Sequence, residues 1–564
     1  MDRTQAGRPR APSRLGKKRK TLTTSPPDAA DVLETMENRA EFLLAERNKL
    51  VEEALTRGRG LVANLVDQIK DDNQDDPDPR YFRAPIDLFD FVLDLEPENL
   101  EAKEEIDKLS DILLDEEAPE PPPSNHDNPF DVIIVGAGAS GVGMGFMLTR
   151  IFNLDPHRVL LLERGEKVGD TFLRWPKEMR FISPSFNSQG WTGSFDLNSV
   201  AYGSSPAYSL HGEHPSGEDY AHYLHDVVET VKLNVQTNTE VIGLRPRRRG
   251  GFAVDVVRTG MDQADAEARP VVTTLRSQYI IWAAGEYQYP QPSAPTFLGS
   301  ELCRHNSTVQ SWKTVSGNDF IVIGGYESGM DAAFNLASCK KHCTVLSSKA
   351  FWQETTDDPS TELSPYTAER MREALASSAP PRLRAPLRVF KVERHRDGGY
   401  VTHARWMAPE KLSVHQHAYR ELPVDNDRVN NDEIGKEGTE IKFRSPQPPF
   451  LCTGFGGSAA MGAAKDLFEW GKDGDRGCAA GSPLLNECDE STMTPGLFLV
   501  GPAVSHENLV FCFIYKFRQR FGIVADAIAR GLGHETAQTI DECRKMDMFL
   551  DDFSCCKGAC GDVC

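Results

Sequence analysis

The sequence predicts an α/β protein with two Rossmann-like strand–turn–helix units and an α-helical appendage before them. Two observations predict the units: residues 131–141 read DVIIVGAGASG and residues 320–331 read FIVIGGYESGMD. Each is an apolar run that ends in closely spaced glycines, as expected for a buried parallel strand that turns into a helix. A third observation, the helical apolar spacing within residues 28–115, with Leu50 on its stripe, predicts the appendage.

The first glycine motif has the spacing of a dinucleotide-binding turn. Gly136 permits a tight turn, Gly138 lets the backbone approach a pyrophosphate, and Gly141 allows close packing of helix and strand. Glu163 ends the next apolar run, 22 residues after Gly141, where an acidic side chain accepts ribose hydroxyls. The helix N-terminus would supply N–H groups to the phosphates. A simpler interpretation, an α/β unit that binds nothing, stays open at this point.

The second motif departs from the first at its middle glycine. Gly324, Gly325 and Gly329 are in place, with Ser328 before the last of them, but Tyr326 stands where the pyrophosphate would approach. This substitution raises the question of whether a dinucleotide can lie against the turn.

The strand after the second motif ends without an acidic residue. It reads TVL and is followed by Ser347, Ser348 and Lys349. Hydroxyl groups and a positive charge at this position suit a ribose 2′-phosphate. The sequence therefore favours NADPH over NADH for the second unit.

Four further segments accompany the two motifs. They are GDTFLRWP at 169–176, IIWAAGEYQYPQ at 280–291, PFLCTGFGG at 449–457 and GLFLVGP at 496–502. Together with the glycine motifs they resemble, in the same order over residues 129–532, the flavin-containing monooxygenase-like branch of the two-dinucleotide-binding flavoproteins.

The resemblance implies an FAD-binding domain with an NADPH-binding domain inserted in it. It implies hydride transfer from NADPH to FAD, with dioxygen and a small-molecule substrate as the reaction partners. It places Asn187 near the oxygen-reacting face as a candidate catalytic residue. It adds to the cofactor-binding residues Arg164, Gly169, Trp175, Gly285, Gly501 and Pro502.

Composition changes along the chain predict its domain boundaries. We expect, in order, a disordered basic head (1–27), an acidic helical appendage able to bind a protein partner or itself (28–115), a proline-rich linker (116–128), the first segment of the FAD domain (129–315), the NADPH domain with a substrate and coupling region (316–445), the second segment of the FAD domain (446–534) and a cysteine-rich tail (535–564).

The overall charge and apolar content limit the partners and the compartment. The net charge of −21 argues against nucleic acid as a partner. No apolar run reaches the ~20 residues that span a bilayer, and the N-terminus lacks the apolar region of a secretory signal. The 12 cysteines do not form a disulfide scaffold in so long a chain, which indicates a reducing, cytoplasmic location. The basic cluster at 16–20 leaves nuclear or organelle targeting open.

The cysteine-rich tail supports an alternative function. Cys555, Cys556, Cys560 and Cys564 lie close enough in sequence to bind a soft metal or to cycle through a disulfide. An NADPH-dependent thiol-disulfide or soft-metal reductase is therefore the second hypothesis. The third is a non-catalytic binding protein with a flavin-type fold, which Tyr326 and the helical appendage keep open.

Overall fold

The computed structural model describes most of the chain from residue 130 onward and some of the region before it. The described residues are 48–63, 92, 99–103, 105, 130–185, 196–248, 250–259, 271–290, 297–353, 362–407, 436–471, 482–506 and 509–553. The chain forms two compact units, residues 1–118 and 119–564. Each unit is described by itself.

The described portion of the first unit is helical, as predicted. One helix covers residues 48–63, and residues 100–103 are also helical. The buried stripe of the first helix contains Val51, Ala54 and Leu55, whereas Leu50 is 47% exposed. The inward-facing residues of this helix are spaced at i, i+3 and i+4 from Val51, and Leu50 lies beside that stripe.

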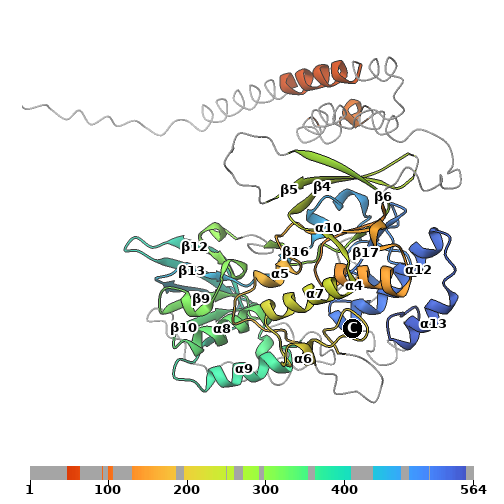
Figure 1. Cartoon of the computed structure of the whole chain (residues 1–564). Helices are drawn as coiled ribbons and strands as arrows, with labels where there is room; N and C mark the ends of the chain where they lie inside the picture. The colour runs from red at the N-terminus through yellow and green to blue at the C-terminus, as the bar shows by residue number, and fades with distance from the viewer. Residues whose placement is uncertain are drawn as a thin grey trace, which may run out of the picture. The chain divides into compact units, whose positions relative to one another are not determined.

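The second unit is built on a seven-stranded sheet (Figure 1). Its strands, in spatial order, are β3 (Asn234–Gln236), β2 (Val159–Leu162), β1 (Phe130–Val135), β6 (Val272–Trp282), β5 (Phe252–Arg258) and β4 (Thr239–Pro246), with β17 (Leu497–Leu499) also paired to β6. Strands β3, β2, β1, β6 and β17 are parallel, while β4 and β5 form an antiparallel extension. Strand β6 joins both regions because its first half pairs with β5 and its second half with β1 and β17.

The helices outside the inserted domain are α4 (Ala139–Phe146, continued by a π-helical turn at Met147–Ile151), α5 (Asp170–Leu173), α6 (Pro206–Ser209), α7 (Gly217–Val231), α10 (Ser458–Met461), α11 (Ile514–Phe517), α12 (Phe521–Gly531) and α13 (Ala537–Lys545). Helix α4 packs on β1 and β2, and α7 and α12 pack on α4. Every residue of α4 is buried. Its Gly143 lies against the ring of Phe521, so α12 packs closely on α4. Helix α7 begins with a capping box formed by Ser216 and Asp219.

A second, five-stranded sheet belongs to the inserted domain. Its order is β11 (Arg382–Arg384), β10 (His342–Leu346), β9 (Asp319–Ile323), β15 (Phe450–Leu451) and β8 (Arg304–His305), and all the pairs are parallel. Helix α8 (Glu327–Ser338) follows β9, and α9 (Pro365–Leu375) packs on α8. Strands β8 and β15 lie outside the expected range of 316–445. The sheet thus takes strands from both sides of that range, from Arg304 to Leu451, and the domain boundaries themselves stay a prediction.

A three-stranded antiparallel sheet packs on the inserted domain. It consists of β12 (Leu387–Arg394), β13 (Tyr400–Trp406) and β14 (Glu440–Ser445). Its apolar residues Leu387, Ala404 and Ile441 form one core with Ile321 and Ile323 of β9. We expected this region to bind the substrate and to couple the two domains. Where the structure describes it, this sheet serves as a structural layer.

The chain crosses between the two domains twice, and the two crossings are hydrogen-bonded to each other. Strand β7 (Tyr289–Pro290) lies on the outward crossing, and β16 (Phe455–Gly456) lies on the return. They pair antiparallel, with Phe455 opposite Pro290. His305 ties the return segment to the inserted domain, because its Nε2 lies 2.9 Å from the carbonyl oxygen of Gly454.

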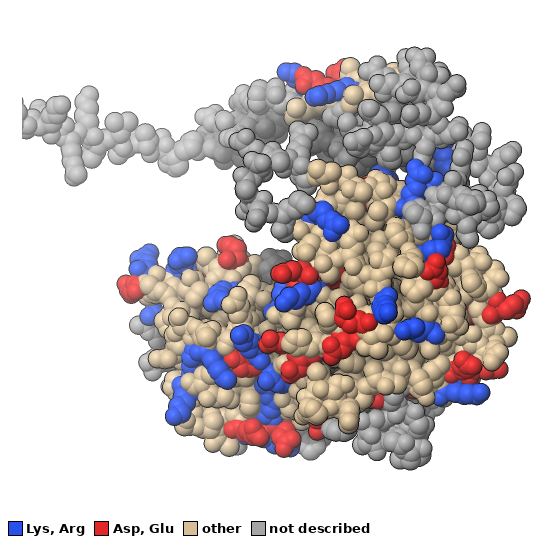
Figure 2. Space-filling model, viewed as in Figure 1, with Lys and Arg blue, Asp and Glu red and all other residues tan. Residues whose placement is uncertain are grey.

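Charges of both signs are mixed on the visible face of the molecule. Lys and Arg side chains alternate with Asp and Glu over the described residues of the second unit (Figure 2). Among the described residues, no helix is long and apolar enough to cross a membrane.

A buried charge cluster fixes the C-terminal segment of the described chain. Asp489 and Arg520 have side chains that are 0% and 2% exposed, and they form an ion pair at 2.7 Å. The guanidinium of Arg520 also donates to the carbonyl oxygen of Leu550 and lies over the ring of Phe553. The cluster therefore holds residues 550–553 against the strand–helix segment that ends at Arg520.

We expect Asp489→Ala to destabilise the second unit by about 3–5 kcal/mol, because it leaves the Arg520 guanidinium buried without its counter-ion. Urea unfolding followed by circular dichroism measures this change. Asp551→Ala is the control, because Asp551 pairs with Arg544 at 2.7 Å on the surface, where such a pair contributes less than about 1 kcal/mol. Equal losses in the two variants would contradict the prediction.

Candidate active site

The first glycine turn leaves open space beside Gly138. Gly136 has φ +107°, which favours glycine, and a Cβ there would lie 2.6 Å from the carbonyl oxygen of Ala283. A Cβ on Gly141 would overlap the carbonyl oxygen of Gly136, so only glycine fits where α4 meets β1. Gly138 is different, because a Cβ there would meet no atom within 4 Å. The turn is thus tight where it packs on the protein and open where a ligand would lie.

Glu163 connects the first turn to the end of β2. Its Oε2 accepts from the N–H of Ala137 at 2.9 Å, and its Oε1 accepts from the N–H of Gly165 at 2.7 Å. Burial raises the pKa of Glu163, and these two hydrogen bonds oppose the shift. Each carboxylate oxygen has a further lone pair, so Glu163 can hold the turn and also accept ribose hydroxyls.

The second glycine turn has the same backbone conformation as the first. Gly324 has φ +107°, and a Cβ on Gly329 would overlap the carbonyl oxygen of Gly324. Tyr326 has φ −95° and ψ −162°, close to the −84° and −164° of Gly138. Its hydroxyl donates to the carbonyl oxygen of Glu362 at 3.1 Å, which anchors the ring. The tyrosine therefore does not distort the turn.

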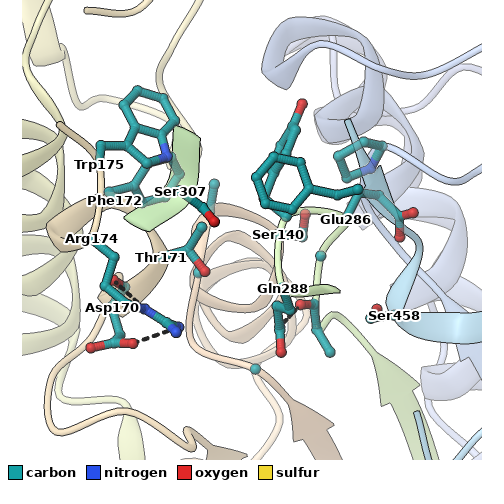
Figure 3. A pocket seen from close by; sticks show the side chains of 18 of the residues that line it. Ser140, Asp170, Thr171, Phe172, Arg174, Trp175, Glu286, Gln288, Ser307 and Ser458 are labelled. Carbon is teal, nitrogen blue, oxygen red and sulfur yellow. Dashed lines mark hydrogen bonds and ion pairs between the residues drawn. The ribbon is translucent and has the colours of Figure 1, made fainter. Parts of the chain in front are cut away.

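A cavity of about 460 Å³ is bordered by both domains. Its walls include eight of the predicted site residues, namely Gly136, Gly138, Glu163, Arg164, Trp175, Gly285, Ser328 and Pro502. In the close-up, Phe172, Thr171 and Trp175 lie on one side of the cavity, and Ser140, Gln288 and Glu286 on the other (Figure 3). The Arg174–Asp170 ion pair borders the first side at 2.7 Å.

Other predicted site residues lie behind the cavity walls or away from them. Gly141 and Gly329 fill the helix–strand contacts, and Gly501 abuts the hydroxyl of Ser140. Gly169 caps α5 and donates its N–H to the carbonyl oxygen of Ala137. The remaining ones, Gly324, Gly325, Ser348 and Lys349, lie in or near the second turn and outside this cavity. Asn187, Cys555, Cys556, Cys560 and Cys564 lie outside the described residues.

Aromatic side chains form the wall next to α5. The ring of Phe172 lies 5.2 Å from that of Trp175 and 4.9 Å from that of Tyr220. Phe181 completes the group, with its ring centroid 4.4 Å from that of Tyr220. Such contacts keep this wall rigid and apolar.

Two comparisons identify the architecture. Residues 133–404, which include both glycine turns, match the family model described as pyridine nucleotide-disulphide oxidoreductase. The match covers just under half of the chain, so it shows a similarity to that family over this segment. The chain superposes on bacillithiol disulfide reductase Bdr (YpdA) from Staphylococcus aureus with a TM-score of 0.51 and 15% identity, covering 72% of this chain and 99% of that one. The Bacillus cereus enzyme of the same name gives 0.50 and 18%, covering 71% and 99%. These two structural matches support the fold alone.

Two curated proteins are similar over a shorter segment. The chain is 23% identical over 226 residues to proteins named uncharacterized oxidoreductase CzcO from Bacillus velezensis and Bacillus subtilis. The match covers 38% of this chain and spans about half (54%) of the length of each relative.

The residues of the first turn fit a bound FAD. The space beside Gly138, the buried N-terminus of α4 and the carboxylate of Glu163 lie on one wall of the cavity. The N–H groups at this helix end can donate hydrogen bonds to a pyrophosphate, and the carboxylate can accept hydrogen bonds from ribose hydroxyls. Among the described residues, no group of His, Cys, Asp and Glu is arranged to hold a metal ion.

The cavity also contains side chains that sequence reasoning missed. They are Glu286, Asn306, Asp331, Arg370 and Cys512. Glu286 and Asp331 lie within two of the segments quoted above, Glu286 directly after Gly285 and Asp331 at the end of the second glycine motif, so the sequence offered a signal for both. Asn306, Arg370 and Cys512 come from three separate segments with no motif, so their proximity depends on the tertiary fold.

Glu286 is the most perturbed carboxyl of these. Burial raises its pKa to about 7, and a hydrogen bond from the N–H of Ser458 opposes the shift. The carboxylate lies against Gly457, where a Cβ would overlap Oε2. A carboxyl group with this pKa can hold or release a proton near neutral pH.

We expect Gly138→Val to abolish FAD binding without unfolding the protein. The backbone at Gly138 is extended and a Cβ built there meets no atom within 4 Å, so the branched side chain would project into the space that we assign to the pyrophosphate. Visible absorbance measures the FAD retained after purification. Gly212→Val is the control, because it is also uncrowded, with its nearest atom at 3.7 Å, and lies outside the cavity. A yellow Gly138→Val protein would contradict this assignment.

We expect Glu286→Gln to stabilise the protein at pH 8 but not at pH 5. A raised pKa means that the folded state favours the protonated carboxyl, so wild type loses stability as the pH rises from about 4.5 through about 7. The neutral amide avoids this loss, which we expect to be about 1–2 kcal/mol because the group is only partly buried. Urea unfolding at both pH values measures it. Glu166→Gln, on the exposed surface, is the control, and a pH-independent difference for Glu286→Gln would refute the prediction.

Proposed function

We propose that this protein is an NADPH-dependent FAD oxidoreductase that acts as a monooxygenase on a small molecule. The observation that carries the proposal is a cavity bordered both by the first glycine turn and by the N-terminal residues of α8, which follow the second turn. Gly138 and Glu163 contribute to it from the FAD side, and Ser328 of α8 contributes from the inserted domain. A volume of about 460 Å³ is within the range of small-molecule sites.

The residues of the cavity supply binding, orientation and exclusion of water. Bound FAD would supply the redox chemistry, in which electrons from NADPH reach dioxygen. The aromatic wall of Phe172, Trp175 and Phe181 restricts water on one side. Glu286 can exchange a proton at its carboxylate. Asn187, the candidate next to the oxygen-reacting face, remains a prediction from the resemblance.

The end of β10 supports NADPH as the reductant. Ser348 and Lys349 are exposed directly after this strand. The neighbouring strand β11 runs parallel and pairs Leu346 with Arg384, which adds a cationic residue at the same edge. A ribose 2′-phosphate would gain hydroxyl donors and positive charge there, whereas an unphosphorylated ribose would lack an acidic acceptor.

The thiol chemistry of the cavity favours oxygenation over disulfide reduction. Among the described residues that line the cavity, Cys512 is the only cysteine. Reduction of a disulfide by exchange needs a pair of thiols. One contact keeps the reductase as the second hypothesis. The ring of Phe553 lies 6.0 Å from that of Phe511, which precedes Cys512 in the chain, and Cys555 follows Phe553 by two residues.

The non-catalytic hypothesis has less support. It depended on Tyr326, and the turn that contains this residue has the dihedral angles of the first turn. Helix α8 therefore begins as α4 does, with its N-terminal N–H groups at the same position relative to the strand.

We expect NADPH to reduce the flavin at least tenfold more efficiently than NADH. Lys349→Ala should raise the KM for NADPH about tenfold, the effect of losing one charge contact of about 1.4 kcal/mol, and leave that for NADH unchanged. Stopped-flow flavin reduction measures both nucleotides. Lys442→Ala, on β14, is the control. Equal wild-type efficiencies with the two nucleotides would reject the assignment.

Deletion of residues 554–564 separates the two catalytic hypotheses. We expect the truncated protein to keep NADPH-driven flavin reduction and oxygen consumption within about twofold of wild type, a barrier change below ~0.5 kcal/mol. Any reduction of disulfides or metal ions should disappear. An oxygen electrode and a thiol assay on both proteins make the measurement. Loss of turnover with every acceptor would replace the monooxygenase proposal with the thiol reductase.

A further inference from the structure

Glu178 connects the FAD-side domain to the inserted domain just after the aromatic wall of the cavity. Its Oε1 accepts from the hydroxyl of Ser311 at 2.6 Å, and its Oε2 accepts from the N–H of Trp312 at 2.9 Å. The N–H of Lys177 also donates to the carbonyl oxygen of Gln310 at 2.9 Å. Three hydrogen bonds therefore join two segments that lie more than 130 residues apart in the chain.

Both of these segments are fixed within their own domains. On the FAD side, residues 176–179 form a turn, and the guanidinium of Arg180 donates to the carbonyl oxygens of Lys177 and Met179 at 2.8 Å each. On the other side, Trp312 is 0% exposed and belongs to the core of the inserted domain. A movement of one domain against the other therefore acts directly on the three hydrogen bonds.

The carboxylate of Glu178 supplies a cap that the inserted domain does not supply itself. Trp312–Thr314 forms a 3₁₀-helical turn, and Ser311 before it makes no side-chain hydrogen bond to this turn. Burial would raise the pKa of Glu178, but the hydrogen bonds from Ser311 and Trp312 outweigh it, so the pKa lies below its ordinary value. Glu178 is therefore ionised at neutral pH, and an ionised acceptor forms the stronger kind of hydrogen bond.

A second contact joins the same wall to the inserted domain. The imidazole of His214 stacks on the ring of Tyr366 of α9, with the ring centroids 3.9 Å apart and the planes 15° apart. The Nδ1 atom of His214 lies 2.8 Å from the carbonyl oxygen of Phe181, which belongs to the aromatic wall. In addition to the β7–β16 pairing, the wall is thus attached to the inserted domain at two places.

We propose that Glu178 is a positioning residue that, together with the His214–Tyr366 stack, holds the inserted domain in one orientation against the aromatic wall. This wall includes Phe172 and Trp175, which lie on one side of the cavity in Figure 3. Glu178 itself does not line the cavity. The proposal goes beyond the proposed function, because it concerns the two domains and not a substrate. Under the proposed function, the same attachment fixes the distance that a hydride crosses between the two nucleotides.

Hydroxyl-radical footprinting of the whole protein tests the orientation without any nucleotide. The readout is the oxidation of His214 and Tyr366, which lie in other segments than Glu178 and are half-buried where they stack. We expect Glu178→Ala to raise the oxidation rate of both rings at least threefold, because the stack opens more often once the other attachment is lost. Glu178→Gln keeps one acceptor oxygen and should give an intermediate rate.

Asp155→Ala is the matched control for the footprinting. Asp155 Oδ1 accepts from the N–H of His157 at 2.9 Å and so caps a 3₁₀-helical turn, but both residues belong to the FAD-side domain. This variant should leave both rings at the wild-type rate. Unchanged oxidation in Glu178→Ala, or an equal rise in the control, overturns the proposal. If circular dichroism shows that Glu178→Ala does not fold, Glu178→Gln decides in its place.

Stopped-flow flavin reduction adds a kinetic readout. We expect Glu178→Ala to lower the reduction rate at saturating NADPH at least tenfold and to leave the Kd of NADPH within twofold. The nucleotide-binding residues stay intact in this variant, but their distance from the flavin is no longer fixed. A raised Kd with an unchanged rate overturns the positioning role. A wild-type flavin that NADPH does not reduce contradicts the proposed function instead, and the footprinting still tests the attachment.

Discussion

The contact between helix and strand at the two glycine turns is the constraint on which the rest of the second unit depends. At each turn a glycine α-carbon lies so close to the preceding backbone carbonyl that no side chain fits, as Gly141 and Gly329 show. This contact sets the direction of α4 and of α8 relative to their sheets. It also brings both helix N-termini to the carboxyl edge of parallel strands, where open α/β sheets bind ligands.

Once these two helix ends are fixed, the cavity follows from the connections between the domains. The outward and return crossings pass beside the FAD-side turn, and they bring Gly285 and Glu286 with them. Helix α9 then closes the far side, because Arg370 reaches the cavity from it and Tyr366 stacks on His214 of the FAD domain at 3.9 Å. The site is therefore assembled from residues that are close only because two separately built sheets face each other.

The difference between locally determined turns and a cavity built from distant segments explains how much the sequence predicted. A local motif determines the backbone geometry of its own residues, so the spacing alone predicted that Gly136, Gly138 and Glu163 lie near one another. The family comparison supports the fold that they imply. Sheet membership at β8 and β15 was missed because strands of two residues have no periodicity to detect. Asn306, Arg370 and Cys512 were missed for another reason. Their environment depends on contacts between segments far apart in the chain, and no pattern of neighbours records such contacts.

The pairing of β7 with β16 has a mechanical consequence. Two single-chain connections side by side could twist independently, but here Phe455 lies opposite Pro290 and Gly456 opposite Tyr289, so they form one ribbon. A two-stranded ribbon bends easily out of its plane and resists shear within it, because shear would break the pairing between the strands. Any shift of the inserted domain relative to the FAD-side sheet therefore has to move both crossings together, and with them Gly285 and Glu286 on the cavity wall.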